Sequence, residues 1–99
     1  MNDAIEIEAA ATIDGEIMEA MERLVPQLSQ SARVPTVDQM REIVASRCTT
    51  LLLARNHMKE RRVVGCLVLA VFRIPTGVRA WIEDVIVDSR SVAWAWARR

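Results

Sequence analysis

The spacing of apolar residues changes once along this chain, and that change constrains the fold more than any other feature. From residue 14 to residue 47, apolar side chains recur every three or four positions, which is the period of an amphipathic helix. From residue 49 to residue 88 they form three nearly continuous runs separated by short polar turns, a pattern typical of strands. Residues 4–12 alternate apolar with acidic side chains before the helices begin, which predicts an edge strand.

Capping residues predict where the two helices begin. Asp14 is placed to cap a first helix, and Pro26, which lacks an amide hydrogen, is expected to end or bend its last turn. The apolar positions of this helix share one stripe: Ile17, Met21, Leu24, Val25 and Leu28. Thr36 and Gln39 have the spacing of a capping box, which predicts a second helix that ends near Arg47.

The three apolar runs predict strands over residues 49–55, 62–74 and 78–88. The first run is continuous, as in strands that are covered on both faces. Gly65 lies inside the second, where a glycine indicates a bulge or the close approach of another backbone. Short connections imply antiparallel neighbours. The order strand-helix-helix-strand-strand-strand therefore predicts an α+β domain, a mainly antiparallel sheet with both helices packed on its faces.

Length and composition limit the class of protein. The chain has 99 residues with 13 basic and 13 acidic side chains, which is typical of one near-neutral domain and supplies no strong basic field for nucleic acid. No apolar run approaches the ~20 residues of a membrane span, and no secretory signal is visible. Cys48 and Cys66 lack metal-ligand spacing and are expected to be reduced thiols in the core. We therefore expect a cytoplasmic protein without a metal, a membrane or a nucleic-acid partner.

The order of elements and three local sequences resemble the N-terminal half of the GNAT (acyl-CoA N-acyltransferase) superfamily. These are LVPQL at residues 24–28, VVG at 63–65 and IEDVIVD at 82–88. The resemblance covers residues 4 to 91, and we assign residues 1–91 to the N-terminal half of such a domain. It implies a half-length GNAT fold and an N-acetyltransferase that uses acetyl-CoA.

The resemblance also implies which residues carry the chemistry. In that family the pantetheine arm of acetyl-CoA lies along the fourth strand and uses its unpaired backbone groups. A backbone amide in the stretch Val85, Ile86, Val87 would then polarise the thioester carbonyl. A carboxylate, Glu83 or Asp84, would deprotonate the amine directly or through water. The alternative is that these two acids form only a solvated pair at a strand edge.

Two further segments receive an interpretation. Residues 29–35 form a polar loop that either contributes to the site of the acetyl acceptor or only connects the helices. His57 lies in a charged turn with no candidate partner in the sequence, so we expect it to be an exposed surface residue.

The chain departs from the family after the fourth strand. There the family has a glycine-rich loop whose backbone amides bind the pyrophosphate, whereas this chain has no glycine after Gly77 and reads VAWAWARR over residues 92–99. Because tryptophan has the single codon TGG and alanine codons begin GC, each Trp-Ala pair contains a glycine codon in the preceding frame. The string CGT GGC GTG GGC GTG GGC GAG GCG encodes RGVGVGEA, and one nucleotide later it encodes VAWAWARR. We therefore expect residues 92–99 to be an out-of-frame tail.

The functional hypothesis is a truncated N-acetyltransferase that acts on an unidentified amine. With the pyrophosphate loop missing, and with no tyrosine to protonate the thiolate as the family commonly does, we expect weak or absent acetyl-CoA binding and little or no activity. The alternative is a non-enzymatic dimerisation or binding module that retains only the fold. Either way, a free fourth-strand edge and an uncovered apolar face predict a homodimer through that edge and the C-terminal tail.

Overall fold

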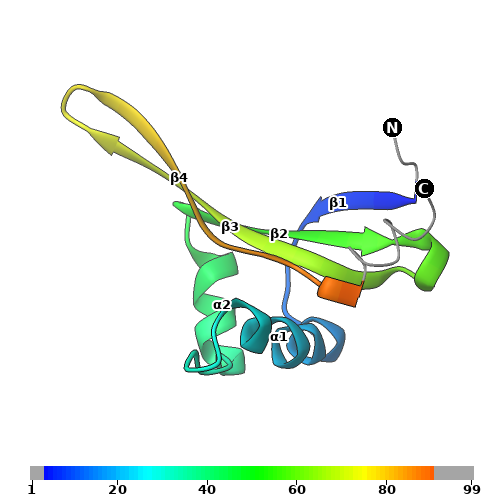
Figure 1. Ribbon diagram of the computed structural model, residues 1–99. Helices are drawn as coiled ribbons and strands as arrows, with labels where there is room; N and C mark the ends of the chain where they lie inside the picture. Colours follow the sequence, from blue (N-terminus) through cyan, green and yellow to red (C-terminus); the bar gives the residue numbers. More distant parts are fainter. Residues whose placement is uncertain (1–3, 91–99) are drawn as a thin grey trace.

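The computed structural model describes residues 4–90 and shows two helices against one four-stranded sheet (Figure 1). The strands are β1 (Ile5–Ala9), β2 (Thr49–Asn56), β3 (Arg62–Ile74) and β4 (Gly77–Val87), and the helices are α1 (Gly15–Leu28) and α2 (Val37–Ala45). The strand order is β1-β2-β3-β4, and every neighbouring pair is antiparallel. The α+β prediction and the predicted order of elements are confirmed.

Both helices begin at the predicted caps. The Asp14 carboxylate accepts a hydrogen bond from the Ile17 amide at 2.9 Å, and Thr36 and Gln39 make both bonds of a capping box at 2.9 and 3.2 Å. Pro26 lies inside the last turn of α1, which continues to Leu28. Within residues 4–90, no helix is long and apolar enough to cross a membrane.

Some element ends differ from the predicted ones. Strand β1 stops at Ala9 rather than residue 12, because the chain turns there toward the cap of α1. Helix α2 ends at Ala45, two residues before the predicted Arg47. Strand β2 continues to Asn56, whose side chain caps a short 3-10 helix, η1 (His57–Lys59), in the predicted polar turn.

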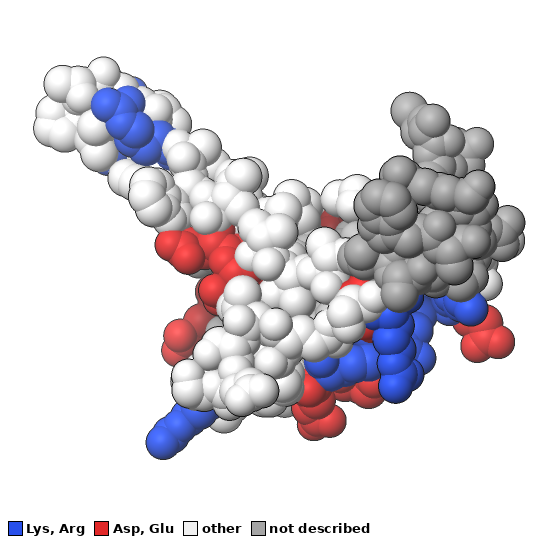
Figure 2. Space-filling model, viewed as in Figure 1, with Lys and Arg blue, Asp and Glu red and all other residues white. Residues whose placement is uncertain are grey.

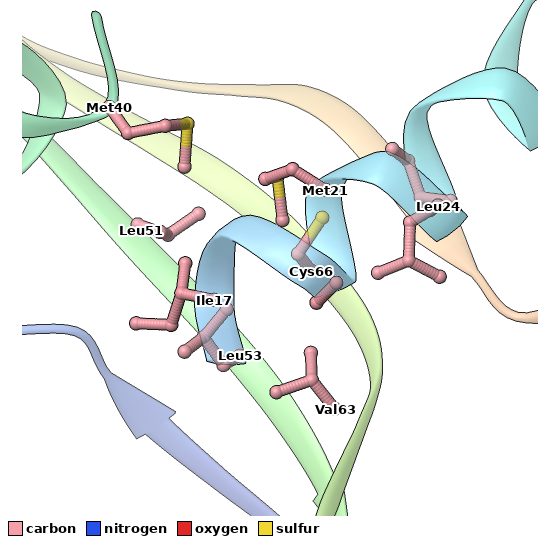
Figure 3. Close-up of a cluster of buried hydrophobic side chains, with 10 residues drawn as sticks. Ile17, Met21, Leu24, Met40, Leu51, Leu53, Val63 and Cys66 are labelled. Carbon is pink, nitrogen blue, oxygen red and sulfur yellow. The ribbon is translucent and has the colours of Figure 1, made fainter. Parts of the chain in front are cut away.

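The core lies between the sheet and the two helices, which cover the same face (Figures 1 and 3). It consists of Ile17, Ala20, Met21, Leu24, Met40, Leu51, Leu53, Val63, Cys66 and Ile86. The expectation that β2 is covered on both faces was therefore wrong. Side chains alternate across a strand, so Leu51 and Leu53 are buried against the helices while Leu52 and Ala54, on the other face, are only half-buried.

Gly65 fulfils both roles predicted for it. Arg55 pairs with Val63 and Ala54 pairs with Gly65, which leaves Val64 as an extra residue of a β-bulge. A Cβ at Gly65 would lie 3.0 Å from the Ile86 carbonyl oxygen of the neighbouring strand. The glycine thus allows β3 and β4 to approach closely just before β4 ends.

The last part of the β3–β4 hairpin projects beyond the rest of the sheet (Figure 1). Strand β2 pairs with β3 only as far as Ala70, so residues 72–74 pair with β4 alone. Pro75 and Thr76 form the predicted reversal between Ile74 and Gly77. We call residues 72–79 the arm.

Candidate functional site

A second bulge interrupts β4 within the segment predicted to carry the site. Cys66 pairs with Ile86 and Val68 pairs with Glu83, so that both Asp84 and Val85 lie opposite Leu67. Asp84 adopts a left-handed backbone conformation with φ 51°. A bulge leaves one residue out of the ladder and bends the strand, and a left-handed non-glycine residue costs about 1–3 kcal/mol. The site therefore stands at a locally strained break in the strand.

The outer side of β4 is an open edge. In the part of the chain that the structure describes, β4 is the last strand of the sheet and pairs only with β3. An edge strand of this kind presents backbone N–H and C=O groups to whatever lies beside it. The free fourth-strand edge that the sequence predicted is thus present in residues 4–90.

A pocket of about 250 Å³ opens beside the bulge on the side of the helices. We call it the helix-side pocket. It is lined by Met21, Val25, Leu28, Ala32, Arg33, Pro35, Met40, Ile43, Leu51, Cys66, Val68, Asp84 and Ile86. The loop over residues 29–35, predicted to contribute to an acceptor site, supplies three of these and so lies across the pocket from Asp84.

The two acids at the bulge have different surroundings. Both are exposed, and Glu83 accepts a hydrogen bond from Trp81 Nε1 at 2.5 Å. Asp84 lines the helix-side pocket and has no hydrogen bond or ion pair with any other residue of 4–90. Burial raises the pKa of the Cys66 thiol to about 11, with the Asp84 charge as a second cause. Figure 2 shows acidic side chains where the arm meets the rest of the molecule.

A second hollow, of about 200 Å³, lies on the opposite face of the sheet. It is lined by Ile7, Leu52, Leu53, Ala54, Gly65, Cys66, Leu67, Val85, Ile86 and Val87, all of them apolar. Val85 and Val87 face this hollow and are more than half exposed, whereas Ile86 is buried and reaches both hollows. The three residues predicted to bind the cofactor thus alternate across β4, with their backbone at its open edge.

Sequence reasoning missed a buried charge network at the end of β4. The Arg23 guanidinium on α1 donates to Asp88 at 3.0 Å and to the Val63 carbonyl at 3.0 Å. Burial raises the pKa of Asp88, but hydrogen bonds from the Arg90 amide, Gln27 and Arg23 together hold it below the usual value. The network fixes the place from which the chain leaves the sheet. The only local signal that could have pointed to Arg23 is its spacing of four residues from Glu19 on the helix, with which it also forms an ion pair.

A second network joins β1 to β2 and was missed as well. The buried Arg55 donates to Glu8 at 2.5 Å, to Glu16 and to the Arg61 carbonyl. His57 is exposed as predicted, and its Nε2 lies 2.9 Å from an oxygen of Glu6, a partner that the sequence did not indicate. The acidic side chains that alternate along β1 are the partners that the sequence pattern did not assign.

The two cysteines differ in exposure. Cys66 is buried in the core as predicted, whereas the same prediction for Cys48 was wrong because this thiol is exposed at the start of β2. Both thiols are free.

Comparisons with known proteins support the fold. No family model matches the chain, and no curated protein sequence does. Two crystal structures of an aminoglycoside acetyltransferase, meta-AAC0020, from an uncultured soil metagenomic sample match with TM-scores of 0.71. The complex with sisomicin is 20% identical and covers 89% of this chain, and the complex with trehalose is 19% identical and covers 90%.

Both comparisons cover 59% of the other chain, so this chain spans about three fifths of the length of the structures that it matches. The likeness covers nearly all of this chain, but because the sequence identity is low it shows the fold alone. The predicted boundary at residue 91 and the tail over 92–99 lie outside the described residues. The two helices and the antiparallel sheet form part of the GNAT acetyltransferase fold, as the resemblance implied.

Proposed function

We propose that the chain carries the acetyl-transfer part of a GNAT-type N-acetyltransferase, with its site at the bulge of β4. The observation that carries the proposal is the exposed Asp84 carboxylate, which has no partner within residues 4–90 and which the bulge places in the lining of a pocket beside the open strand edge. Backbone strain costs stability, and strained residues cluster at functional sites. The fold of the acetyltransferases described above is consistent with this chemistry.

The residues present fit an acetyl-CoA arm at this place. When bound, acetyl-CoA supplies a thioester whose carbonyl carbon an amine can attack. The backbone of Val85–Val87 would hold the extended arm through strand-like hydrogen bonds, and an amide freed by the bulge would polarise the carbonyl. Asp84 would take the proton that the amine loses, with Glu83 as the alternative base. In the absence of tyrosine, solvent would protonate the departing thiolate.

We further propose that residues 92–99 replace a glycine-rich loop that is encoded one frame earlier. This chain would then bind acetyl-CoA weakly and turn it over slowly, because each charge-assisted hydrogen bond lost from the pyrophosphate is worth about 1.5–3 kcal/mol. The nucleotide sequence tests this directly. Because the two Trp-Ala pairs give x-Gly-x-Gly one nucleotide earlier with any codons, the informative observation is whether that frame continues open past codon 99. We expect an open continuation, and a gene without one in that frame would contradict the proposal.

Calorimetry tests the cofactor site itself. We expect saturable binding of acetyl-CoA in the millimolar range and similar affinity for acetyl-pantetheine, because the arm is held and the diphosphate is not. 3′-Phospho-ADP, which is the nucleotide part with its diphosphate and without the arm, should give no saturable heat. If neither acetyl-CoA nor acetyl-pantetheine binds, the proposed acetyltransferase site is wrong and the binding-module alternative is favoured.

That alternative has an observation of its own in its favour. Val78, Trp81, Ile82, Val85 and Val87 along β4 are each more than half exposed, which is unusual for a soluble sheet edge. We propose that a second copy of the chain pairs with this edge in the antiparallel direction, giving a homodimer. The contribution predicted for the C-terminal tail lies outside the described residues. The free thiols of Cys48 and Cys66 fit a reducing compartment, which supports the cytoplasm as the proposed location.

Sedimentation velocity over a concentration series tests the dimer. We expect concentration-dependent association, which Val85→Lys should abolish because it places a charge on the pairing strand. Ile7→Lys places the same charge on β1, at the other end of the same face, and should leave association unchanged. A monomer at millimolar concentration would exclude the homodimer.

A further inference from the structure

We infer that the helix-side pocket takes a small amine with an apolar body and a single positive charge, and that it discriminates against polycationic sugars. The inference deepens the proposed function, on which it rests, by naming the class of acetyl acceptor. It differs from the chemistry of the matched acetyltransferase, one of whose crystal structures contains sisomicin.

The lining of the pocket is the first argument. Apart from Arg33 and Asp84, all of its lining residues are apolar. The apolar residues offer no side-chain hydrogen bonds to a sugar, so the desolvation of every hydroxyl group beyond the reach of Arg33 and Asp84 would be uncompensated. An alkyl or aryl group has no hydrogen bonds to lose there, and the burial of its apolar surface is favourable.

Size is the second argument. An apolar cavity of about 150 Å³ is sufficient to bind benzene. The helix-side pocket, at about 250 Å³, therefore has room for one ring and a short chain. An aminoglycoside of several rings exceeds that volume, and most of it would remain outside.

Charge is the third argument. Asp84 has no partner among residues 4–90, so its carboxylate is available to an ammonium group. The bulge places it on the same side of the sheet as Ile86 and Val68. Arg33 brings a positive charge to the same lining, so the two charges cancel. Asp84 attracts one ammonium group. Arg33 repels any additional positive charge on the ligand, and the pocket lining contains no second acid to offset that repulsion.

Titrations in the absence of acetyl-CoA test the inference, monitored by NMR at pH 7. We expect phenethylamine to bind saturably and to shift the amide signals of residues 21, 33, 40, 84 and 86. Sisomicin should bind at least tenfold more weakly, and phenylacetate should not bind. Sisomicin binding as tightly as phenethylamine, or phenethylamine shifts elsewhere on the molecule, would overturn the inference.

A matched pair of variants isolates the carboxylate. Asp84→Asn keeps the size of the side chain and tolerates the left-handed backbone, and we expect it to weaken phenethylamine binding about tenfold. Asp38→Asn removes an exposed acid on α2 and should leave the affinity unchanged. Equal weakening by both variants, or by neither, would contradict the assignment to Asp84.

These titrations separate the inference from the proposed function. Amine binding at the pocket without any acetyl-pantetheine binding would sink the acetyltransferase proposal and retain the ligand class. Acetyl-pantetheine binding together with a preference for sisomicin would retain the acetyltransferase proposal and overturn the inferred ligand class.

Discussion

The two edges of the sheet are built in opposite ways. Strand β1 has five residues, and its two acids, Glu6 and Glu8, are bonded to Arg55, Arg61 and His57. Strand β4 has eleven residues, a bulge, several exposed apolar side chains and one acid without a partner among residues 4–90. Short, charged edges resist further pairing, whereas long apolar edges recruit a strand or an extended ligand. Within residues 4–90, β1 is therefore the short edge with paired charges, and β4 is the long edge available for further pairing.

The same comparison separates structural charges from a functional one. At the β1 end, basic and acidic side chains neutralise each other, and their removal should cost stability. At the bulge of β4, Asp84 contributes no bond to the described fold and occupies a strained conformation. Substitutions at the two edges should therefore affect different measurements.

The largest effect on stability is expected at the β1 edge. Arg55→Met should lower the free energy of unfolding by about 3 kcal/mol, because it removes charge-assisted bonds to Glu8 and Glu16 and leaves the Arg61 carbonyl without its donor. Arg79→Met makes the same change on the exposed arm of β4 and should alter stability by less than about 0.5 kcal/mol. Urea denaturation of the two variants checks the contrast, and equal losses would refute the distinction between the edges.

The end of β4 should show a smaller, pH-dependent effect. Arg23→Met should cost about 2 kcal/mol at pH 7, because Asp88 is 3% exposed and loses its cation. The pKa of Asp88 is held below its ordinary value of 3.8, so ionised Asp88 stabilises the fold above about pH 4. That stabilisation is lost as the pH falls through the lower pKa of the folded state.

The penalty of Arg23→Met should therefore shrink between pH 5 and pH 2.5. The control is Arg41→Met, which breaks an exposed pair with Asp38 and should cost less than about 0.5 kcal/mol at every pH. A penalty for Arg23→Met that stays constant with pH would show that Asp88 is not its source.

The close approach of β3 and β4 predicts a loss of about 1 kcal/mol for Gly65→Ala. The new Cβ would lie 3.0 Å from the Ile86 carbonyl oxygen, so the strands must move apart slightly. Gly15→Ala is the matched change at the start of α1, where a Cβ meets nothing within 4 Å, and it should not destabilise the protein. Thermal unfolding distinguishes the two.

The smallest effect on stability is expected at the site. Asp84→Asn should change the free energy of unfolding by less than about 0.5 kcal/mol, because no bond within residues 4–90 is lost and asparagine tolerates the same backbone. A loss above about 1 kcal/mol in the same urea experiment would mean that the carboxylate serves the fold.

The fold could be predicted from the sequence because its signals are local. Asp14 and the pair Thr36 and Gln39 begin their helices through contacts within three residues, and strand β3 follows directly from its apolar run. The face on which the helices pack could not be derived in this way. A continuous run such as that of β2 has the same sequence pattern whether one or both of its faces are covered.

The site was only partly predictable. The segment 83–87 followed from a resemblance, but which acid enters a pocket depends on the register shift between β3 and β4, which no spacing within β4 reveals. Arg23 and Asp88 lie 65 residues apart, and Arg55 and Glu8 lie 47 apart. Such pairs are set by tertiary packing, so sequence reasoning assigned neither of them.

The most direct test of the contrast between the edges is an NMR titration of the isotope-labelled chain with acetyl-pantetheine. We expect saturable shifts of the backbone amides of residues 83–87 on β4, with residues 5–9 on β1 unaffected. Shifts of equal size on β1, or no shift on β4 at millimolar acetyl-pantetheine, would contradict the proposed contrast between the edges.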